Sequence, residues 1–272
     1  LNQDLAASAG TFADRGLSEE TGSFELNEPT SPTETPVRRL QWLQPMLKIA
    51  SVFFIGLGIY YFMMFDQMTE VQTLVAEKTT IELPDASKVT LNALSEVRYN
   101  KGAWSEKREI ELDGEAFFDV AKGATFDVVT DAGTISVLGT EFNVKNRGAF
   151  FEVACYEGPV RVVTADHTEI LKVGDNFKLY KGDAVKGRHS QDTPLWTDNM
   201  SDFQRIPLSQ VLAELERQYG VDTLIENIDT DQLFTGAFVH NNLENALKSI
   251  SEPLNLDYEI INPDQVRLSK RE

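Results

Sequence analysis

The most apolar stretch of the chain covers residues 49–65, which contain no charged side chain in 17 positions. Extending it back to Met46 gives 20 residues with Lys48 as the only charge. Twenty helical residues span about 30 Å, the thickness of the hydrocarbon core of a bilayer. The segment is apolar on all sides, which disfavours a buried amphipathic helix, and about forty residues precede it, which disfavours a cleaved signal peptide. The pattern predicts a single transmembrane helix over residues 46–65.

The flanking charges predict how this helix is oriented. Arg38, Arg39 and Lys48 lie on its N-terminal side, whereas Asp66 and Glu70 follow it. Positively charged flanks stay in the cytoplasm, so the N-terminus is expected there and residues 66–272 outside it. Residues 1–45 are polar and include the segment 29–36 (PTSPTETP), whose prolines oppose a helix; we expect a mostly disordered cytoplasmic tail.

Residues 70–190 alternate between apolar and polar positions in short runs, as in 109–112 (EIEL) and 134–137 (TISV). Turn signals recur about every ten residues, and no helical pattern interrupts them. Alternation with a period of two buries one face of a strand. The pattern predicts an all-β domain, either a sandwich or a coiled β structure, with a tight turn at 113–115 (DGE) and a bulge or close backbone approach at 139–140 (GT).

Residues 199–270 have a different pattern. The run 206–209 (IPLS) is expected to open a helix that Gly220 ends, and Asn242 to begin a second helix that Pro253 ends. Strands are expected at 221–225, 233–239, 256–261 and 265–268. The predicted order is strand–helix–strand, then strand–helix–strand–strand, with both helices on one face of one sheet. The fold class is therefore mainly β with a small α+β domain at the end.

Charge and composition exclude several functions. The net charge of −18 argues against nucleic-acid binding, which needs Lys and Arg to neutralise phosphates. Cys155 is the single cysteine, and the histidines number three, which argues against a metal centre. No phosphate-binding loop, nucleophile elbow or zinc-protease motif occurs. We expect no enzyme activity, no cofactor and no metal.

Five motifs in the middle of the chain together resemble the FecR family. They are 83–92 (LPDASKVTLN), 109–120 (EIELDGEAFFDV), the pair 126–128 (FDV) with 137–144 (VLGTEFNV), 157–160 (EGPV) and 171–175 (LKVGD). Ala86 stands where the family pattern has glycine. The segments 207–212 and 234–238 resemble the small signalling-like domain that follows FecR domains in Bacteroidetes-type members, so the likeness covers residues 44–270. Its recurring motif residues here are Pro84, Asp85, Gly114, Glu115, Gly139, Thr140 and Gly158.

The resemblance implies an anti-sigma factor in the inner membrane. Its cytoplasmic end would hold an extracytoplasmic-function sigma factor. Its periplasmic end would sense a TonB-dependent outer-membrane transporter through that transporter's signalling domain. Proteolysis commonly releases the sigma factor in this family.

A strand of the last domain is the expected partner-binding site, because an extended partner can add to a sheet edge. This strand consists of Leu233, Phe234, Thr235, Gly236, Ala237, Phe238 and Val239. The alternative is a membrane-anchored periplasmic module that binds a small molecule or a glycan without binding a sigma factor. Trp104 and Trp196, near predicted loops, motivate that alternative, although tryptophans are more often core residues.

Overall fold

The computed structural model describes residues 43–65 and 68–271. The chain divides into two units, Leu1–Ser51 and Val52–Glu272, and helix α1 (Leu43–Phe65) crosses the division. The predicted cytoplasmic tail lies almost entirely outside the described residues. Among the residues described, no helix is both long enough and apolar enough to cross a membrane. The membrane span over residues 46–65 stays a prediction.

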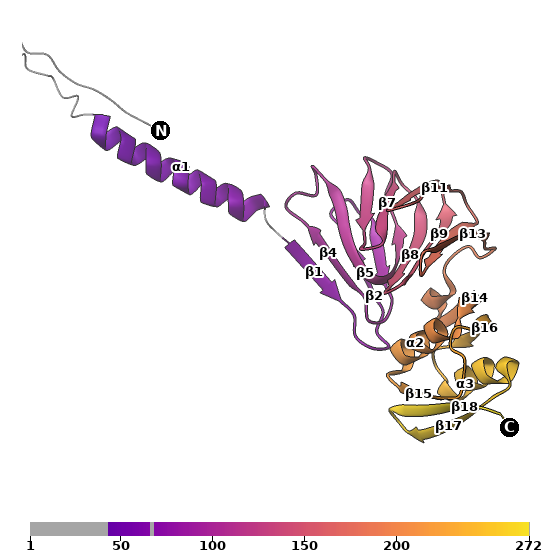
Figure 1. The fold of residues 1–272 in the computed structure, drawn as a ribbon. Helices are drawn as coiled ribbons and strands as arrows, with labels where there is room; N and C mark the ends of the chain where they lie inside the picture. Colours follow the sequence, from indigo (N-terminus) through magenta and orange to yellow (C-terminus); the bar gives the residue numbers. More distant parts are fainter. Residues whose placement is uncertain (1–42, 66–67, 272) are drawn as a thin grey trace, which may run out of the picture. The chain divides into compact units, whose positions relative to one another are not determined.

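The β domain of the second unit is a sandwich of two layers, drawn in purple and pink in Figure 1. Strands β1–β13 are Met68–Gln72, Thr79–Glu82, Lys88–Leu91, Glu96–Asn100, Arg108–Asp119, Phe126–Val129, Gly133–Val137, Glu141–Arg147, Phe150–Glu157, Val160–Thr164, Thr168–Leu171, Asp175–Tyr180 and Asp183–Arg188. One layer has the order β1-β4-β5-β6-β7-β10-β11 and the other β2-β3-β5-β8-β9-β12-β13. The inward-facing apolar side chains of both layers form one core, as their alternation predicts.

Strand β5 belongs to both layers, and this corrects the turn predicted at residues 113–115. Its first half pairs with β4 and β6, and its second half pairs with β3 and β8. Gly114 lies between the halves with φ of +114°, and a Cβ there would lie 2.6 Å from Ser95 Oγ. The glycine therefore permits a long strand to pass from one layer to the other, rather than to reverse.

The C-terminal domain has the predicted order of strands and helices. After the 3-10 helix η1 (Leu195–Asp198) come β14 (Met200–Pro207), α2 (Leu208–Tyr219), β15 (Asp222–Glu226), β16 (Leu233–Val239), α3 (Leu243–Ser251), η2 (Glu252–Leu254), β17 (Leu256–Asn262) and β18 (Gln265–Lys270). Gly220 caps α2 in the left-handed conformation, and the Asn242 side chain accepts a hydrogen bond from Asn245 N at the start of α3. The predicted fold class is thus confirmed.

Two details of this domain differ from the prediction. Ile206 and Pro207 end strand β14 instead of opening the helix. The strands form two sheets, β14-β16 and β15-β18-β17, and not one. The apolar faces of both helices pack with these sheets into a second core.

Candidate functional site

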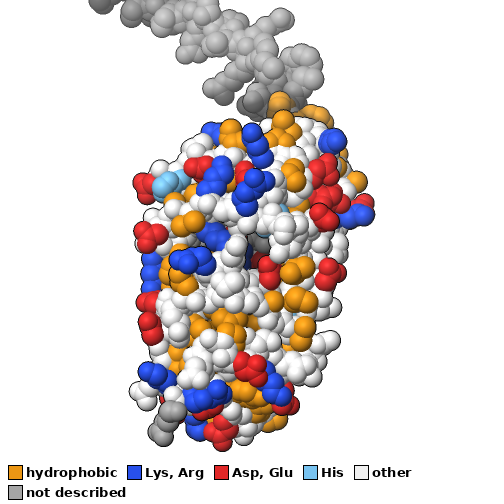
Figure 2. Space-filling view, turned by 90° about the vertical axis from the view of Figure 1, so that its right-hand side faces the viewer, with side chains coloured by type: hydrophobic (Ala, Val, Ile, Leu, Met, Phe, Trp, Pro, Cys, Tyr) orange, Lys and Arg blue, Asp and Glu red, His pale blue; other side chains and the backbone are white. Residues whose placement is uncertain are grey.

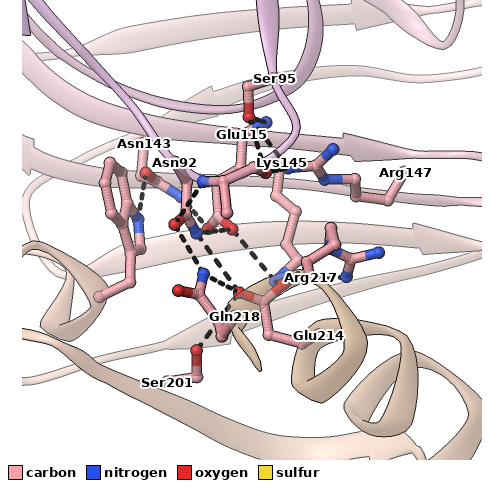
Figure 3. Close-up of polar contacts among 12 residues, drawn as sticks. Asn92, Ser95, Glu115, Asn143, Lys145, Arg147, Ser201, Glu214, Arg217 and Gln218 are labelled. Carbon is pink, nitrogen blue, oxygen red and sulfur yellow. Dashed lines mark hydrogen bonds and ion pairs between the residues drawn. The ribbon is translucent and has the colours of Figure 1, made fainter. Parts of the chain in front are cut away.

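A buried cluster of charged and amide side chains joins the two domains (Figure 3). Glu115 lies on β5, Lys145 and Arg147 on β8, and Glu214 and Arg217 on α2. We call these five residues the junction cluster. Glu115 and Glu214 are 4% and 0% exposed, so both carboxylates are removed from water.

Glu214 receives hydrogen bonds from both domains. Its Oε2 accepts from Arg217 at 2.9 Å and lies 3.4 Å from Lys145 Nζ. Its Oε1 accepts from Gln218 Nε2 at 2.9 Å and, more distantly, from Asn92 Nδ2 and Ser201 Oγ at 3.4 Å. One carboxylate thus connects the helix α2 to strand β8 and to the loop after β3.

Amide side chains complete the junction. Asn92 donates to Glu115 Oε2 at 2.9 Å and accepts from Gln218 Nε2 at 2.8 Å. Asn143 donates to Glu115 Oε1 at 3.1 Å and accepts from Trp196 Nε1 at 3.0 Å. Each amide therefore links Glu115 to a residue of the C-terminal domain or of η1 that leads into it.

The electrostatics favour the charged forms of the central pair. Burial opposes ionisation of Glu214, but Lys145, Arg217 and Arg147 outweigh it and hold the pKa of this carboxyl well below its usual range. Burial also opposes the charge of Lys145, but Glu115 and Glu214 raise the pKa of its ammonium group. Removing one partner of such a buried pair typically costs about 3–5 kcal/mol, because the other charge stays in the interior.

A second contact involves the segment between β1 and β2, residues 73–78, which we call the strap. Ala76 N donates to Arg217 O at 2.9 Å. Lys78 Nζ donates to Trp196 O at 2.6 Å and to Asn199 Oδ1 at 2.8 Å, and lies 2.9 Å from His240 Nδ1. Strand β1, the first strand after α1 along the chain, therefore continues directly into a segment held by the C-terminal domain.

His240 is neutral at ordinary pH in this setting. Burial and the neighbouring Lys78 ammonium lower the pKa of its imidazole to about 4. Nε2 lies 2.9 Å from Ser201 Oγ, while Nδ1 accepts from Lys78. Burial lowers the pKa of Lys78 too.

The expected partner strand is β16, with the same bounds as predicted. It pairs antiparallel with β14, and Phe234 and Phe238 point into the second core. Leu233 is 49% exposed. A Cβ at Gly236 would lie 2.6 Å from Phe234 Cζ, so the Phe234 ring covers this position of the strand.

The family motif residues lie in three places. Pro84 and Asp85 form the turn between β2 and β3, where Asp85 pairs with Arg108. Glu115 belongs to the junction cluster. Thr140 follows Gly139 between β7 and β8, where Thr140 O accepts from Val120 N at 3.0 Å, and Gly158 in the β9–β10 turn lies close to Thr140.

The tryptophans that motivated a ligand-binding alternative are buried. Trp104 and Trp196 are each 4% exposed, and Trp104 packs edge-on against Tyr99 and Phe126 in the first core. Across residues 43–65 and 68–271, no group of His, Cys, Asp and Glu side chains is placed to hold a metal ion. The chemistry of the site is ionic and hydrogen-bonding.

Sequence reasoning missed most of this site: Lys78, Asn92, Lys145, Glu214, Gln218 and His240. One signal was available. Glu214 and Gln218 are one turn apart on the same helical face as Val211 and Leu215, which is the buried face of α2. A carboxylate and an amide on an apolar stripe require buried partners. The partner strands, about 70 to 120 residues earlier, could not be inferred from spacing.

Comparisons with known proteins agree with this architecture. A family model described as FecR protein matches residues 69–161, and one described as FecR, C-terminal, matches residues 201–268. Together the two matches cover more than half of the chain. The chain belongs to the FecR family. No curated protein sequence matches it.

Solved structures similar to this FecR-family protein carry both domains. Two crystal structures of a candidate anti-sigma factor from Parabacteroides distasonis, at 2.50 Å and 1.65 Å resolution, match with TM-scores of 0.71 and 0.70. Their sequence identities are 27% and 28%; the matches cover 76% and 75% of this chain and 100% of each crystallised chain. The family and these neighbours support an anti-sigma regulator.

Proposed function

We propose that this FecR-family protein is an inner-membrane anti-sigma regulator. Residues 46–65 would anchor it, residues 1–45 would bind an extracytoplasmic-function sigma factor, and the two described domains would lie in the periplasm. The charge-free stretch 49–65 and the basic residues before it support this topology. In this arrangement the C-terminal domain receives the signal, and the chain segment after the membrane passes it on.

The observation that carries the proposal is the contact between the strap and the C-terminal domain. Ala76 N and Lys78 Nζ bind Arg217 O, Trp196 O and Asn199 Oδ1, so the segment after β1 is held by residues far along the chain. A change in the C-terminal domain that moves α2 and η1 would break these bonds. It would thereby free the C-terminal end of strand β1, which pairs with β4 and follows the predicted anchor.

The proposed periplasmic partner is the signalling domain of a TonB-dependent transporter, and β16 is the proposed contact. A groove of about 400 Å³ lies beside this strand and α3, lined by Ala237, Phe238, Val239 and Lys248 among others. Within the described part of the chain, the sheet β14-β16 has two strands, which leaves a strand edge to which a partner strand could add.

Co-purification tests the sigma-factor end. The full chain is tagged and mixed with each extracytoplasmic-function sigma factor of the same organism. We expect one sigma factor to bind the full chain. We expect this binding to disappear when residues 1–45 are deleted. Absence of binding to all of them would overturn the anti-sigma proposal.

A strand variant tests the other end. Leu233→Asp places a charge on the exposed end of β16, and Leu224→Asp is the matched control on β15, where Leu224 is 39% exposed. Transporter signalling domains are passed over the immobilised full chain. We expect Leu233→Asp to lower the affinity for one signalling domain at least tenfold, and Leu224→Asp to leave this affinity unchanged. Equal affinities of the two variants would exclude β16 as the contact.

A further inference from the structure

A cleft of about 540 Å³ lies on the outer face of the β domain, where the C-terminal domain meets it. Its floor comes from β8, β9 and β12, and its walls from the linker 188–196 and from β14 and β16. The face of the molecule that carries this region is hollowed near its middle, with basic side chains beside the hollow (Figure 2). A volume of this size is within the range of small-molecule sites, about 300–1,000 Å³.

Two polar groups in the cleft are open to a ligand, because Tyr156 is half-buried and Asp202 is exposed. The Tyr156 hydroxyl makes no hydrogen bond within the residues described, although its ring is fixed between Phe117 and His189, at centroid distances of 5.9 and 4.6 Å. The Asp202 carboxylate forms no ion pair in the same part of the chain. One group can donate and the other accepts, so a ligand with hydroxyl groups satisfies both.

Apart from Asp202, the charged side chains that line the cleft have partners: Arg188 at the wall lies 3.9 Å from Asp175, and the floor holds two ion pairs. Lys145 lies 3.2 Å from Glu115, and Lys178 lies 3.4 Å from Glu152. These pairs leave no surplus cation for a phosphate or a carboxylate at the floor. They also leave no cluster of free carboxylates for a metal ion. A neutral ligand fits this surface better than an anion or a cation.

The remaining lining is of the kind that recognises hydroxyl groups. Gln191 and Gln204 present amides at the walls, each able to donate and accept. At the floor, the Asn176 amide donates to Glu152 Oε1 at 3.0 Å and so holds that carboxylate in place. The Tyr156 ring adds an aromatic surface to the lining, against which C–H groups can pack. Planar polar groups around one fixed aromatic ring suit a ligand with alternating hydroxyl and C–H faces.

We propose that this cleft binds a neutral saccharide of one or two rings. The sugar hydroxyls would donate to the Asp202 carboxylate and accept from the Tyr156 hydroxyl. The cleft also includes Thr235 and Gly236 of β16, so an occupied cleft would lie against the proposed partner strand. This assignment does not depend on the buried tryptophans, nor on sigma-factor binding.

Calorimetric titration tests the proposal. The full chain is placed in lipid nanodiscs, so that no sugar-based detergent competes. It is titrated with glucose, galactose, N-acetylglucosamine, maltose, cellobiose and xylobiose. Glucuronate and citrate serve as anionic probes. We expect at least one neutral sugar to bind with a Kd below 10 mM, as an order of magnitude, and the anions not to bind.

Paired variants locate the binding. Tyr156→Phe keeps the ring and removes the hydroxyl, and Asp202→Asn keeps the shape and removes the charge. We expect each to weaken sugar binding roughly tenfold. The controls Tyr258→Phe and Asp229→Asn lie outside the cleft and should bind as the wild type does, and thermal unfolding checks that all four variants fold.

Three results would overturn the assignment: no binding of any neutral sugar, binding of the anions alone, or sugar binding that Tyr156→Phe and Asp202→Asn leave unchanged. Sigma-factor co-purification by the same preparation reports separately on the proposed function. The two proposals can therefore fail independently.

Discussion

Two buried ion pairs of similar chemistry do different work in this molecule. Arg108 and Asp85 pair within the β domain, with side chains 10% and 17% exposed. Lys145 and Glu214 pair between the domains, with side chains 15% and 1% exposed. The residues of the first pair are 23 positions apart and those of the second 69.

The first pair fixes local loops. Arg108 also donates to Ala121 O at 2.8 Å and to Ala124 O at 2.6 Å, so it connects the β2–β3 turn to the loop after β5. The second pair fixes one domain on the other. Replacement of Arg108 should therefore loosen nearby loops, whereas replacement of Glu214 should loosen the junction and the strap.

Replacing Glu214 should have the largest effect. Glu214→Ala leaves Lys145 and Arg217 buried without this carboxylate, so we expect the free energy of unfolding to fall by about 3–5 kcal/mol. Denaturant unfolding of the full chain measures this. The control is Glu244→Ala, which breaks an exposed pair with Lys248 and should change the value by less than about 0.5 kcal/mol. If the free energy of unfolding fell by a similarly small amount in both variants, the junction cluster would contribute little to stability.

Replacing Arg108 should have a smaller and more local effect. Arg108→Met removes the guanidinium and keeps the apolar stem beside the Phe126 ring. We expect a loss of about 2–3 kcal/mol, less than for a fully buried pair because water reaches both groups. Hydrogen exchange should accelerate at residues 83–87 and 121–124 and stay unchanged in α2. Faster exchange in α2 would contradict the separation of the two roles. Arg98→Met, in an exposed pair with Glu96, is the control.

A pH titration sharpens the comparison at the strap. The pKa of His240 is lowered to about 4, so the unfolded chain binds more protons than the folded chain between about pH 6.5 and 4. The contribution of neutral His240 to the free energy of unfolding is complete above about pH 6.5 and is lost as the pH falls toward 4. We expect this contribution to amount to about 1 kcal/mol, after allowance for solvent screening. His240→Asn keeps an acceptor for Lys78 but does not titrate.

Urea midpoints at several pH values measure this effect. The difference between the wild type and His240→Asn should shrink as the pH falls from 7 to 4. A constant difference would mean that His240 is not the group responsible.

The smallest predicted effect lies in the family's first turn. Ala86 adopts φ of +65°, a conformation that glycine takes without strain. Ala86→Gly should raise the free energy of unfolding by up to about 1 kcal/mol, since the relief of strain exceeds the added chain entropy. Ala124→Gly, where φ is not positive, should give no gain. A loss at Ala86 equal to that at Ala124 would contradict this account.

Local patterns predicted much of the fold. Alternation predicted the β domain, and the bounds of β16 were correct because the mostly apolar run Leu233–Val239 has polar residues on both sides. Gly220 and Asn242 mark helix ends through backbone geometry that depends on near neighbours alone. The turn predicted at Gly114 was wrong because glycine indicates a positive φ, which is compatible both with a turn and with the passage of a long strand between two layers.

The junction could not be predicted in the same way. Glu214 pairs with Lys145 and Asn92 across the domain boundary, and no local period reports such a pairing. The division of the last domain into two sheets has the same cause, because strand pairing between β14 and β16 skips over α2 and β15. Long-range contacts of this kind depend on the finished packing.

Hydrogen exchange of the strap tests the central claim that the C-terminal domain controls the segment leading to α1. The full chain is compared with Glu214→Ala under conditions in which both remain folded. The account predicts faster exchange at Ala76 and across β1, with β6 and β7 of the core unchanged. Exchange at Ala76 and β1 that stays at the wild-type rate while α2 loosens would contradict it.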